Sequence, residues 1–389
     1  MIHTRAWVGV VVCGLLVALV LWSYQEPSVG VAGADSAVKK VQCDKGQTLT
    51  DALKKAKPGD TLQVTGTCQE RVTITTDRLT LDGGGSAVLD GGGVGPTESE
   101  GVVTIDGADG VTLTGLTIQK GAGEGILGHH GAAFAVQQTT VQNNAASGIA
   151  VADGSTADLT DCTIHDNGFG IDVFTSSSAI LRGAIIISQN KGNGAEVNGQ
   201  SMLEIRGAQV QMNDNGGIGL VAGSGQVAIF GFAAAQGSTL TANGNGDFGI
   251  IIYNSLLTIL GSDFGSGANV ITAANNGVAG ILVSDGFIAS PFGTGKFVIE
   301  HNTTGLHFIN GAGGDITGGL SVQNNGTGML ADGAGTLTLA SIPPNPSAIE
   351  NNGTDVDLKF GTRATFQDVA IGTIACDATV LSRGSTVCP

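Results

Sequence analysis

The chain has 389 residues and a net charge of -16, and charged residues make up 13% of it, about half the share usual for a globular domain. A protein this acidic is expected to repel nucleic acid and anionic membrane surfaces, and acidic polysaccharides too unless a basic patch or a bound cation intervenes. A hydrophobic content of 41% excludes a disordered chain, and 64 glycines with only 4% aromatic residues fit a stack of narrow coils with many tight corners.

The N-terminus has the features of an export signal. Arg5 precedes an uncharged apolar run over residues 6–22, and Ala-Gly-Ala at residues 32–34 offers a cleavage site. An anchor that stays uncleaved is the alternative, because the run is close to the minimum length of a membrane span. We expect residues 1–34 to be a signal peptide or signal anchor and residues 35–40 a linker. The protein is then extracytoplasmic (secreted, periplasmic or on the cell surface), and any membrane contact is confined to this segment.

The stretch that follows is different in kind from the rest of the chain. Thr48 or Thr50 can cap a short helix, and Pro58 ends it. The apolar stripe of this helix consists of Leu49, Ala52 and Leu53. Because the open end of a solenoid exposes its apolar cross-section and unpaired strand edges, it needs a cover. We therefore expect residues 41–100 to form an N-terminal cap with the first coils.

The central region repeats with a period of 23 residues. An apolar residue recurs three positions before a glycine or an asparagine, as in Ile118/Gly121, Val141/Asn144, Ile164/Asn167, Ile187/Asn190 and Val210/Asn213. The unit returns at Leu240/Asn243, Ile299/Asn302, Val322/Asn325 and Ile349/Asn352. A fixed period with turn residues at one phase indicates a solenoid. Asparagine tolerates the left-handed corner conformation, and stacked asparagines can pass amide hydrogen bonds from coil to coil. We predict roughly 10 to 12 coils of three short strands, with the regular repeats in residues 101–355.

The last segment, residues 356–389, loses this repeat and is expected to form a C-terminal cap. With export implied, the cysteines near the two ends are predicted to form disulfides, Cys43 with Cys68 and Cys376 with Cys388. Cys162 is left over and is expected to be a buried, unreactive thiol.

Two sequence patterns are similar to those of a known fold family. One is G-Q-T-L…A-L…P-G-D over residues 46–60, and the other is the coil form T-I-x-x-N-x-x-G, as in residues 163–170. Over about residues 41–353 the chain resembles the right-handed parallel β-helix proteins of the pectin-lyase-like fold. The resemblance implies an all-β, right-handed parallel β-helix (β-solenoid) with a short N-terminal capping helix.

The family includes polysaccharide lyases, hydrolases, epimerases, phage tailspikes and adhesins. Its lyases typically use an arginine or lysine base, often with calcium, and its hydrolases use clustered aspartates. No such motif matches at a definite position here, so the resemblance assigns no catalytic residue. Calcium remains a candidate cofactor.

Residues that directly follow the inward apolar positions should face the solvent. This row gives the ligand-binding candidates Gln119, Gln142, His165 and Gln211, and the adjacent row adds Gln189. His165 is the one side chain in its row that titrates near neutrality. Together with Asp166 it could form a sugar-binding or acid/base patch. A plain solvated sheet face is the favoured alternative.

Two further groups are candidates for chemistry. Arg182 and Arg206 should stack in neighbouring coils beside Asp161, where they would bind a substrate carboxylate or supply a lyase base. A surface ion-pair ladder is the alternative. Asp172 should lie one coil from Asp153 or Asp158, as a carboxylate pair for glycoside hydrolysis.

His129 and His130 lie at a corner near Glu124 and Lys120. Consecutive residues of a strand point to opposite faces, so both histidines reach one ion only if the corner bends sharply. A simple loop is favoured, and we predict no metal site.

These features lead to one functional prediction with an alternative. We expect a monomeric exported protein that interacts with extracellular or cell-envelope polysaccharide, with lyase or hydrolase activity as the enzymatic form of that prediction. The alternative is a non-catalytic surface protein, an adhesin or a structural scaffold. The sequence lacks basic stretches interleaved with aromatic residues, so no nucleic-acid partner is expected.

Overall fold

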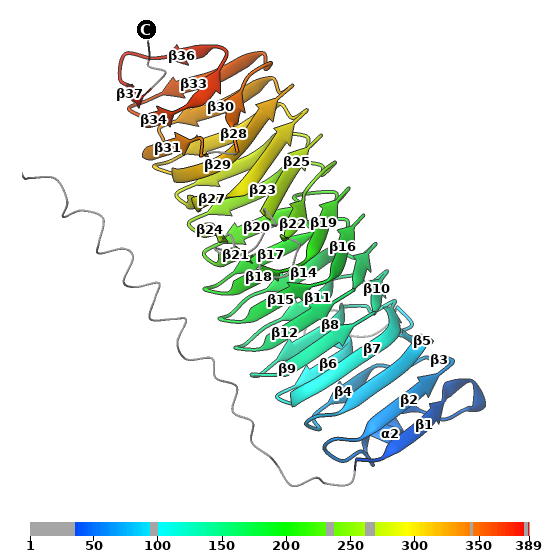
Figure 1. Ribbon diagram of the computed structural model, residues 1–389. Helices are drawn as coiled ribbons and strands as arrows, with labels where there is room; N and C mark the ends of the chain where they lie inside the picture. The colour runs from blue at the N-terminus through cyan, green and yellow to red at the C-terminus, as the bar shows by residue number, and fades with distance from the viewer. Residues whose placement is uncertain are drawn as a thin grey trace, which may run out of the picture. The chain divides into compact units, whose positions relative to one another are not determined.

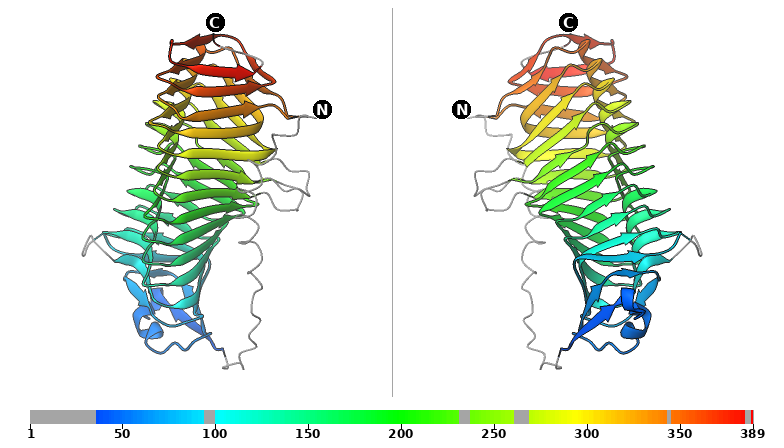
Figure 2. Two further views of the ribbon diagram at one scale, coloured as in Figure 1. Left: turned by 90° about the vertical axis from the view of Figure 1, so that its left-hand side faces the viewer. Right: turned by 90° about the vertical axis from the view of Figure 1, so that its right-hand side faces the viewer.

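Most coils of the described chain consist of three short strands that pair in parallel with the strands of the neighbouring coils. The computed structural model describes residues 36–93, 100–230, 237–260, 269–342, 345–384 and 388. The predicted signal segment, residues 1–34, lies outside these. Figures 1 and 2 show the coils stacked in chain order, from blue at the N-terminal end to red at the C-terminal end. Among the described residues, no helix has the length and apolar character needed to cross a membrane.

One face of the stack, which we call sheet I, is a sheet of 13 parallel strands. In chain order the strands of sheet I are β4 (Val72–Ile74), β6 (Gly101–Asp106), β8 (Glu124–His129), β11 (Ser147–Val151), β14 (Phe169–Val173), β17 (Ala195–Asn198), β20 (Leu220–Gly223), β23 (Phe248–Tyr253), β26 (Ala279–Ser284), β28 (Thr304–Ile309), β30 (Thr327–Asp332), β33 (Thr354–Lys359) and β36 (Ile374–Cys376).

The other two faces, sheets II and III, are joined into one 24-stranded sheet by four long strands that run from one face to the other. These are β5 (Thr80–Asp90), β7 (Asp109–Gln119), β27 (Phe287–Glu300) and β29 (Gly313–Gln323). Sheet II also contains β1 (Val38–Gln42), β2 (Thr61–Thr65), β9 (Ala133–Gln137), β12 (Thr156–Thr160), β15 (Ser178–Arg182), β18 (Met202–Arg206), β21 (Gln226–Phe230), β24 (Leu256–Leu260), β31 (Thr336–Ala340), β34 (Arg363–Gln367) and β37 (Leu381–Gly384). Sheet III also contains β3 (Thr67–Cys68), β10 (Thr140–Gln142), β13 (Thr163–His165), β16 (Ala184–Ser188), β19 (Gln209–Asn213), β22 (Thr239–Thr241), β25 (Asn269–Ala274), β32 (Ser347–Ile349) and β35 (Val369–Ile371).

A continuous ladder of buried asparagines follows the corner between sheets III and I. From Asn144 to Asn325, each side-chain amide donates to the side-chain oxygen of the asparagine in the next coil at 2.9–3.2 Å. The same oxygen accepts the backbone N–H of the preceding asparagine, as in Asn144 N to Asn167 Oδ1 at 3.0 Å. The ladder therefore satisfies backbone groups that strand pairing leaves open at this corner. Its members are Asn144, Asn167, Asn190, Asn215, Asn245, Asn276, Asn302, Asn325 and Asn352.

In the middle of the chain, the members of the observed ladder lie two residues later than the asparagines that we predicted. Asn213 and Asn243 were expected to be members, but Asn215 and Asn245 take these places. The coil before Asn215 is two residues longer than the repeat, so Ile187 pairs with Met212, and Val210 pairs with Ile185. In the next two coils the inward position belongs to Ala242 and Ala273, whose carbonyls accept from the ladder. Larger apolar residues were expected at this position, so these two repeats were missed in the sequence.

A column of glycines faces the ladder from the start of the sheet I strands. A Cβ added to Gly148 would lie 2.8 Å from the amide nitrogen of Asn167 and 2.5 Å from a methyl carbon of Ile164. Such contacts are too short for any side chain, so the close packing of corner and ladder requires glycine. The same crowding is found at Gly125, Gly170, Gly194, Gly219, Gly249, Gly280, Gly305 and Gly328.

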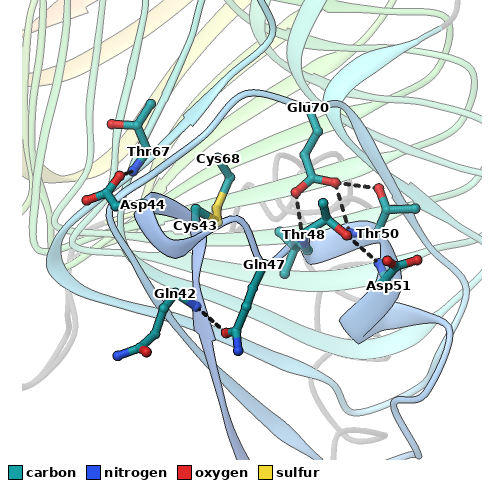
Figure 3. The surroundings of a disulfide bond; sticks show 11 residues. Gln42, Cys43, Asp44, Gln47, Thr48, Thr50, Asp51, Thr67, Cys68 and Glu70 are labelled. Atoms are coloured by element: carbon teal, nitrogen blue, oxygen red, sulfur yellow. Dashed lines mark hydrogen bonds between the residues drawn. A yellow bond between two sulfur atoms is a disulfide. The ribbon is translucent and has the colours of Figure 1, made fainter.

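The predicted N-terminal capping helix is present. Helix α2 (Leu49–Leu53) buries Leu49 in the core, and Thr48 accepts the N–H of Asp51 at its start. The carboxylate of Glu70, which the sequence did not single out, accepts the N–H groups of Leu49 and Thr50 at 2.5 and 2.9 Å. Figure 3 shows this arrangement beside the disulfide that joins the 3-10 helix η1 (Cys43–Lys45) to β3. A negative charge at a helix start is favourable because it faces unpaired N–H groups.

The coils continue further at both ends than we expected. β1 begins within the segment expected to be a linker and pairs with β2. After residue 355 the strands from β33 to β37 keep parallel register with the preceding coils. The predicted disulfides Cys43–Cys68 and Cys376–Cys388 are both formed. Cys162 is buried, and burial raises the pKa of its thiol to about 11, which fits an unreactive group.

The ladder should be a principal source of stability. Replacing Asn167 by Ala leaves the buried N–H of Asn144 and the carbonyl of Val141 without their partners. We expect the free energy of unfolding to fall by about 2–4 kcal/mol, as measured by urea denaturation followed by circular dichroism. The control is Gln211→Ala at an exposed position of β19, which should change it by less than about 0.5 kcal/mol. Equal losses in the two variants would contradict this role.

Candidate functional site

The predicted polar row lies on the outer side of sheet III. Gln119, Gln142 and His165 are in register on β7, β10 and β13. The amide of Gln142 donates to Gln119 Oε1 at 2.9 Å, and His165 Nδ1 lies 2.6 Å from a carboxylate oxygen of Asp166. The expected His165–Asp166 pair is therefore present, but its neighbours bond mainly to one another. Gln211 does not join them, because the two-residue insertion places it beside Ile186 and Thr241.

Gln189 and Asp166 lie at the corner that follows this row. Both have a left-handed backbone, as do Lys120 and Asn143 in the preceding coils. Together with Lys191 and their neighbours they line a hollow of about 590 Å³. The corner that carries the asparagine ladder lines this hollow. The hollow therefore results from the stacking of turns. It brings together two of the predicted candidates, one from each of two coils.

The two predicted arginines are in adjacent coils, but each has a carboxylate partner. Arg182 Nε donates to both oxygens of Asp158, at 3.2 and 2.8 Å. Arg206 pairs with Glu204 and lies over the ring of Phe230, 5.7 Å from its centre. Asp161, the expected partner, instead turns the chain and accepts the N–H of Ala184. The two arginines therefore form separate ion pairs on sheet II, and the partly exposed Arg182–Asp158 pair contributes little to stability.

Asp172 has a different neighbour from the one we predicted. It lies on the outer side of β14, in register with Glu196 of β17, whereas Asp153 and Asp158 belong to a corner and to sheet II. Asp158 was mistaken for a neighbour because sequence spacing alone does not say which of the three faces a residue occupies. A local signal does exist, since Gly170-Ile-Asp-Val and Gly194-Ala-Glu-Val repeat 24 residues apart. The sequence analysis missed Glu196.

Two other carboxylates of sheet I influence the carboxyl group of Asp172. Burial raises the pKa of Asp172 to about 6, and the nearby carboxylates of Glu196 and Glu124 add to the shift. Burial also raises the pKa of Glu124. Asp172 Oδ1 and Glu124 Oε2 are buried and have no hydrogen-bond partner among the described residues. An unpaired buried carboxylate is costly, which marks the group as a candidate for proton transfer.

Glu196 is held in place by two amides. Asn193 donates to one of its oxygens at 2.5 Å and Asn198 to the other at 3.3 Å. Asn193 is itself fixed, because its side-chain oxygen accepts the N–H of Ile218 at 2.7 Å. Asp172 therefore faces a carboxylate whose orientation is set by its surroundings. The pair thus combines a carboxyl group that can hold a proton, that of Asp172, with a carboxylate held in a fixed orientation, that of Glu196.

The same face continues into an aromatic and amide-lined region. Asn198, Gly223 and Tyr253 are in register on β17, β20 and β23, and Tyr253 is 53% exposed. At the corner between sheets I and II, a hollow of about 660 Å³ is lined by polar residues and by Phe287, which is 40% exposed. Asn254 and Asp285 line this hollow and turn the chain in the left-handed conformation. Aromatic surfaces next to amides are suited to the faces and hydroxyls of sugars.

The three carboxylates do not form a ready-made calcium site. Among the described residues, Glu124, Asp172 and Glu196 do not bring one oxygen each to within 4.8 Å of one another. Calcium requires six to eight oxygens at 2.3–2.6 Å in general, so binding here would need movement of these side chains.

The buried charge of Asp172 should make stability depend on pH. Its pKa in the folded protein, about 6, lies above the unfolded value of about 3.9. The folded state therefore binds the proton more tightly, and the charged form destabilises it above pH 6; this penalty disappears as the pH falls toward 4. Asp172→Asn should thus raise the free energy of unfolding by about 2–3 kcal/mol at pH 8 and by much less at pH 4.

Denaturant titrations at the two pH values measure this difference. Asp247→Asn, at an exposed corner position, is the matched control and should show no such gain at pH 8. A stabilisation of Asp172→Asn that is equal at both pH values would contradict the expected pKa.

One family model matches part of the chain, and several solved structures are similar to it. Residues 100–264 match the family model described as "Right handed beta helix region". No curated protein matches the sequence. Among solved structures, the chain is similar to the A-module of the mannuronan C-5 epimerase AlgE6 of Azotobacter vinelandii, with 15% identity and a TM-score of 0.44 over 86% of this chain and 93% of that one.

Two other solved structures are similar at comparable or lower levels. The enzymatically active domain of tailspike protein 2 of bacteriophage CBA120 has 10% identity and a TM-score of 0.45, over 72% of this chain and 47% of that one. Pectin methylesterase PemA from Erwinia chrysanthemi has 12% identity and a TM-score of 0.35, over 63% and 90%. The matched family model and the parallel pairing of successive coils together identify the chain as a right-handed parallel β-helix repeat protein.

Proposed function

We propose that the protein binds polysaccharide along the outer face of sheet I and hydrolyses a glycosidic bond there. The observation that carries this proposal is the Asp172–Glu196 pair, a protonatable buried carboxyl beside a positioned carboxylate. Pairs of acidic side chains are the usual catalytic apparatus of glycoside hydrolysis, one as the acid and the other as the nucleophile or base.

The two residues take different roles because their surroundings differ. Asp172 holds a proton up to about pH 6 and is the general acid that protonates the leaving oxygen. Glu196, oriented by the amides of Asn193 and Asn198, is the nucleophile. Neighbouring strands lie about 4.8 Å apart, close to the separation of about 5–5.5 Å that retaining enzymes use. We therefore propose hydrolysis with retention of the anomeric configuration.

The charge of the face favours a neutral glycan. Asp172 and Glu196 are in register on sheet I, Glu124 lies two coils before Asp172 on the same sheet, and the whole chain carries a net charge of -16, so a polyuronate would be repelled. Tyr253 lies three coils from Asp172, about 14 Å along the stack at 4.8 Å per coil. It offers a stacking surface for a sugar unit beyond the one that is cleaved, and Asn198 lies between them.

Export is part of the proposal. The disulfides Cys43–Cys68 and Cys376–Cys388 are typical of an oxidising compartment. The predicted signal in residues 1–34 would deliver the protein there, where extracellular or cell-envelope glycans are its partners.

The test is an assay of the purified protein on neutral glycans, pectate and alginate, with and without calcium. We expect new reducing ends from a neutral glycan, and proton NMR of the first product should show the retained anomer. Activity should decline as the pH rises above about 6, because Asp172 loses its proton. Asp172→Asn and Glu196→Gln should each lower kcat by at least about 100-fold, whereas Asp247→Asn should leave it unchanged.

Several outcomes would overturn the assignment. If His165→Ala abolishes cleavage and Asp172→Asn does not, the reaction belongs to the predicted polar row of sheet III. Unsaturated product ends would indicate a lyase. Glycan binding without any product would favour the alternative of a non-catalytic surface protein.

A further inference from the structure

Two consecutive histidines at the corner between sheets I and II turn their rings toward each other. His129 is the last residue of β8, and His130 continues the chain with a φ of 56°. Along an extended strand their side chains would point to opposite faces. The left-handed residue bends the chain so sharply that the ring centres are 4.1 Å apart. The bend that the sequence left undecided is therefore present.

Asp106, at the end of β6, lies against both rings from the preceding coil. It is in register with His129. Its Oδ1 atom lies 2.7 Å from His130 Nδ1 and 3.6 Å from His129 Nε2. One ligand atom from each of the three side chains lies within 4.8 Å of the other two. Residues 23 and 24 positions apart in the sequence thus converge because the coils stack in register.

We propose that Asp106, His129 and His130 form a binding site for a divalent transition-metal ion of the zinc class. Two imidazole nitrogens and one carboxylate suit Zn²⁺, whereas Ca²⁺ and Mg²⁺ prefer oxygen ligands alone. Metal–ligand bonds of about 2.1 Å in a tetrahedron place the ligand atoms roughly 3.4 Å apart. The observed separations of 2.7 and 3.6 Å lie on either side of that value, so small side-chain rotations suffice. Asp106 would exchange its hydrogen bond with His130 for a bond to the metal.

The site is open to solvent and lies in acidic surroundings. The side chain of His129 is 19% exposed, that of Asp106 38% and that of His130 64%. Asp153 occupies the same corner in the next coil, where its carbonyl accepts the N–H of Gly131 at 2.9 Å. An excess of negative charge raises the local concentration of cations. Three protein ligands leave a coordination position for water or an anionic group, and nothing in this site depends on the Asp172–Glu196 mechanism.

The experiment is a titration of the purified, EDTA-treated and dialysed protein with ZnCl₂, followed by isothermal calorimetry. We expect one high-affinity Zn²⁺ per chain and an increase in Tm on binding, because the ion binds only the folded state. His129→Gln and Asp106→Asn should each weaken binding by at least about tenfold. His130→Asn should do the same, and asparagine tolerates the left-handed backbone at this position. The imidazole resonances of His129 and His130 should shift on addition of Zn²⁺.

His165→Ala is the matched control. His165 also contacts an aspartate, at 2.6 Å from Asp166, but no second histidine completes a cluster there among the described residues. This variant should bind Zn²⁺ as the parent does. Absence of binding in the parent protein would overturn the proposal. So would unchanged affinity in the folded Asp106, His129 and His130 variants, which would place the ion elsewhere on the acidic surface.

Discussion

The asparagine ladder is the interaction on which the rest of the structure depends. Strand pairing between coils satisfies most backbone groups, but the sharp corner between sheets III and I leaves buried N–H and C=O groups open. From Asn144 to Asn352 one asparagine per coil fills this need, and one glycine per coil gives it room. The ladder is unbroken although successive members are 23 to 31 residues apart. Extra residues are therefore accommodated away from this corner, for example between β21 and β22 and between β24 and β25.

This constraint has a functional consequence, because it keeps the strands of sheet I in strict register. Side chains of successive coils then form columns on the outer face. In one column, Leu127, Ala150 and Val221 occupy the positions on either side of Asp172 and Glu196. The fold thus accepts apolar residues in this column and has no need of acids there. Two adjacent half-buried acids with apolar residues in the neighbouring coils on both sides are better explained by chemistry than by stability.

The charged groups on the other faces are paired differently. Arg182 with Asp158 and Arg206 with Glu204 neutralise each other on sheet II, and His165 pairs with Asp166 beside sheet III. Left-handed corners add a second means of placing side chains. They line the hollow next to Tyr253 with Asn254 and Asp285, and they aim the rings of His129 and His130 at each other. In-register strands and left-handed corners therefore place different sets of polar side chains on different parts of the solenoid.

The sequence by itself determined the β-solenoid, its capping helix, the disulfide pairs and most of the ladder, because these features depend on local periodicity and on residues with few conformational options. It also identified Asp172 as a candidate. Only the tertiary structure decided which residues meet. Insertions of a few residues shift the register, so Gln211 left its predicted row and Ala242 and Ala273 replaced larger apolar residues in theirs. The pairing of Asp172 with Glu196, and of Asp106 with two histidines, depends on which face each residue occupies in adjacent coils. A one-dimensional spacing does not contain that information, because three strands and three corners share each period.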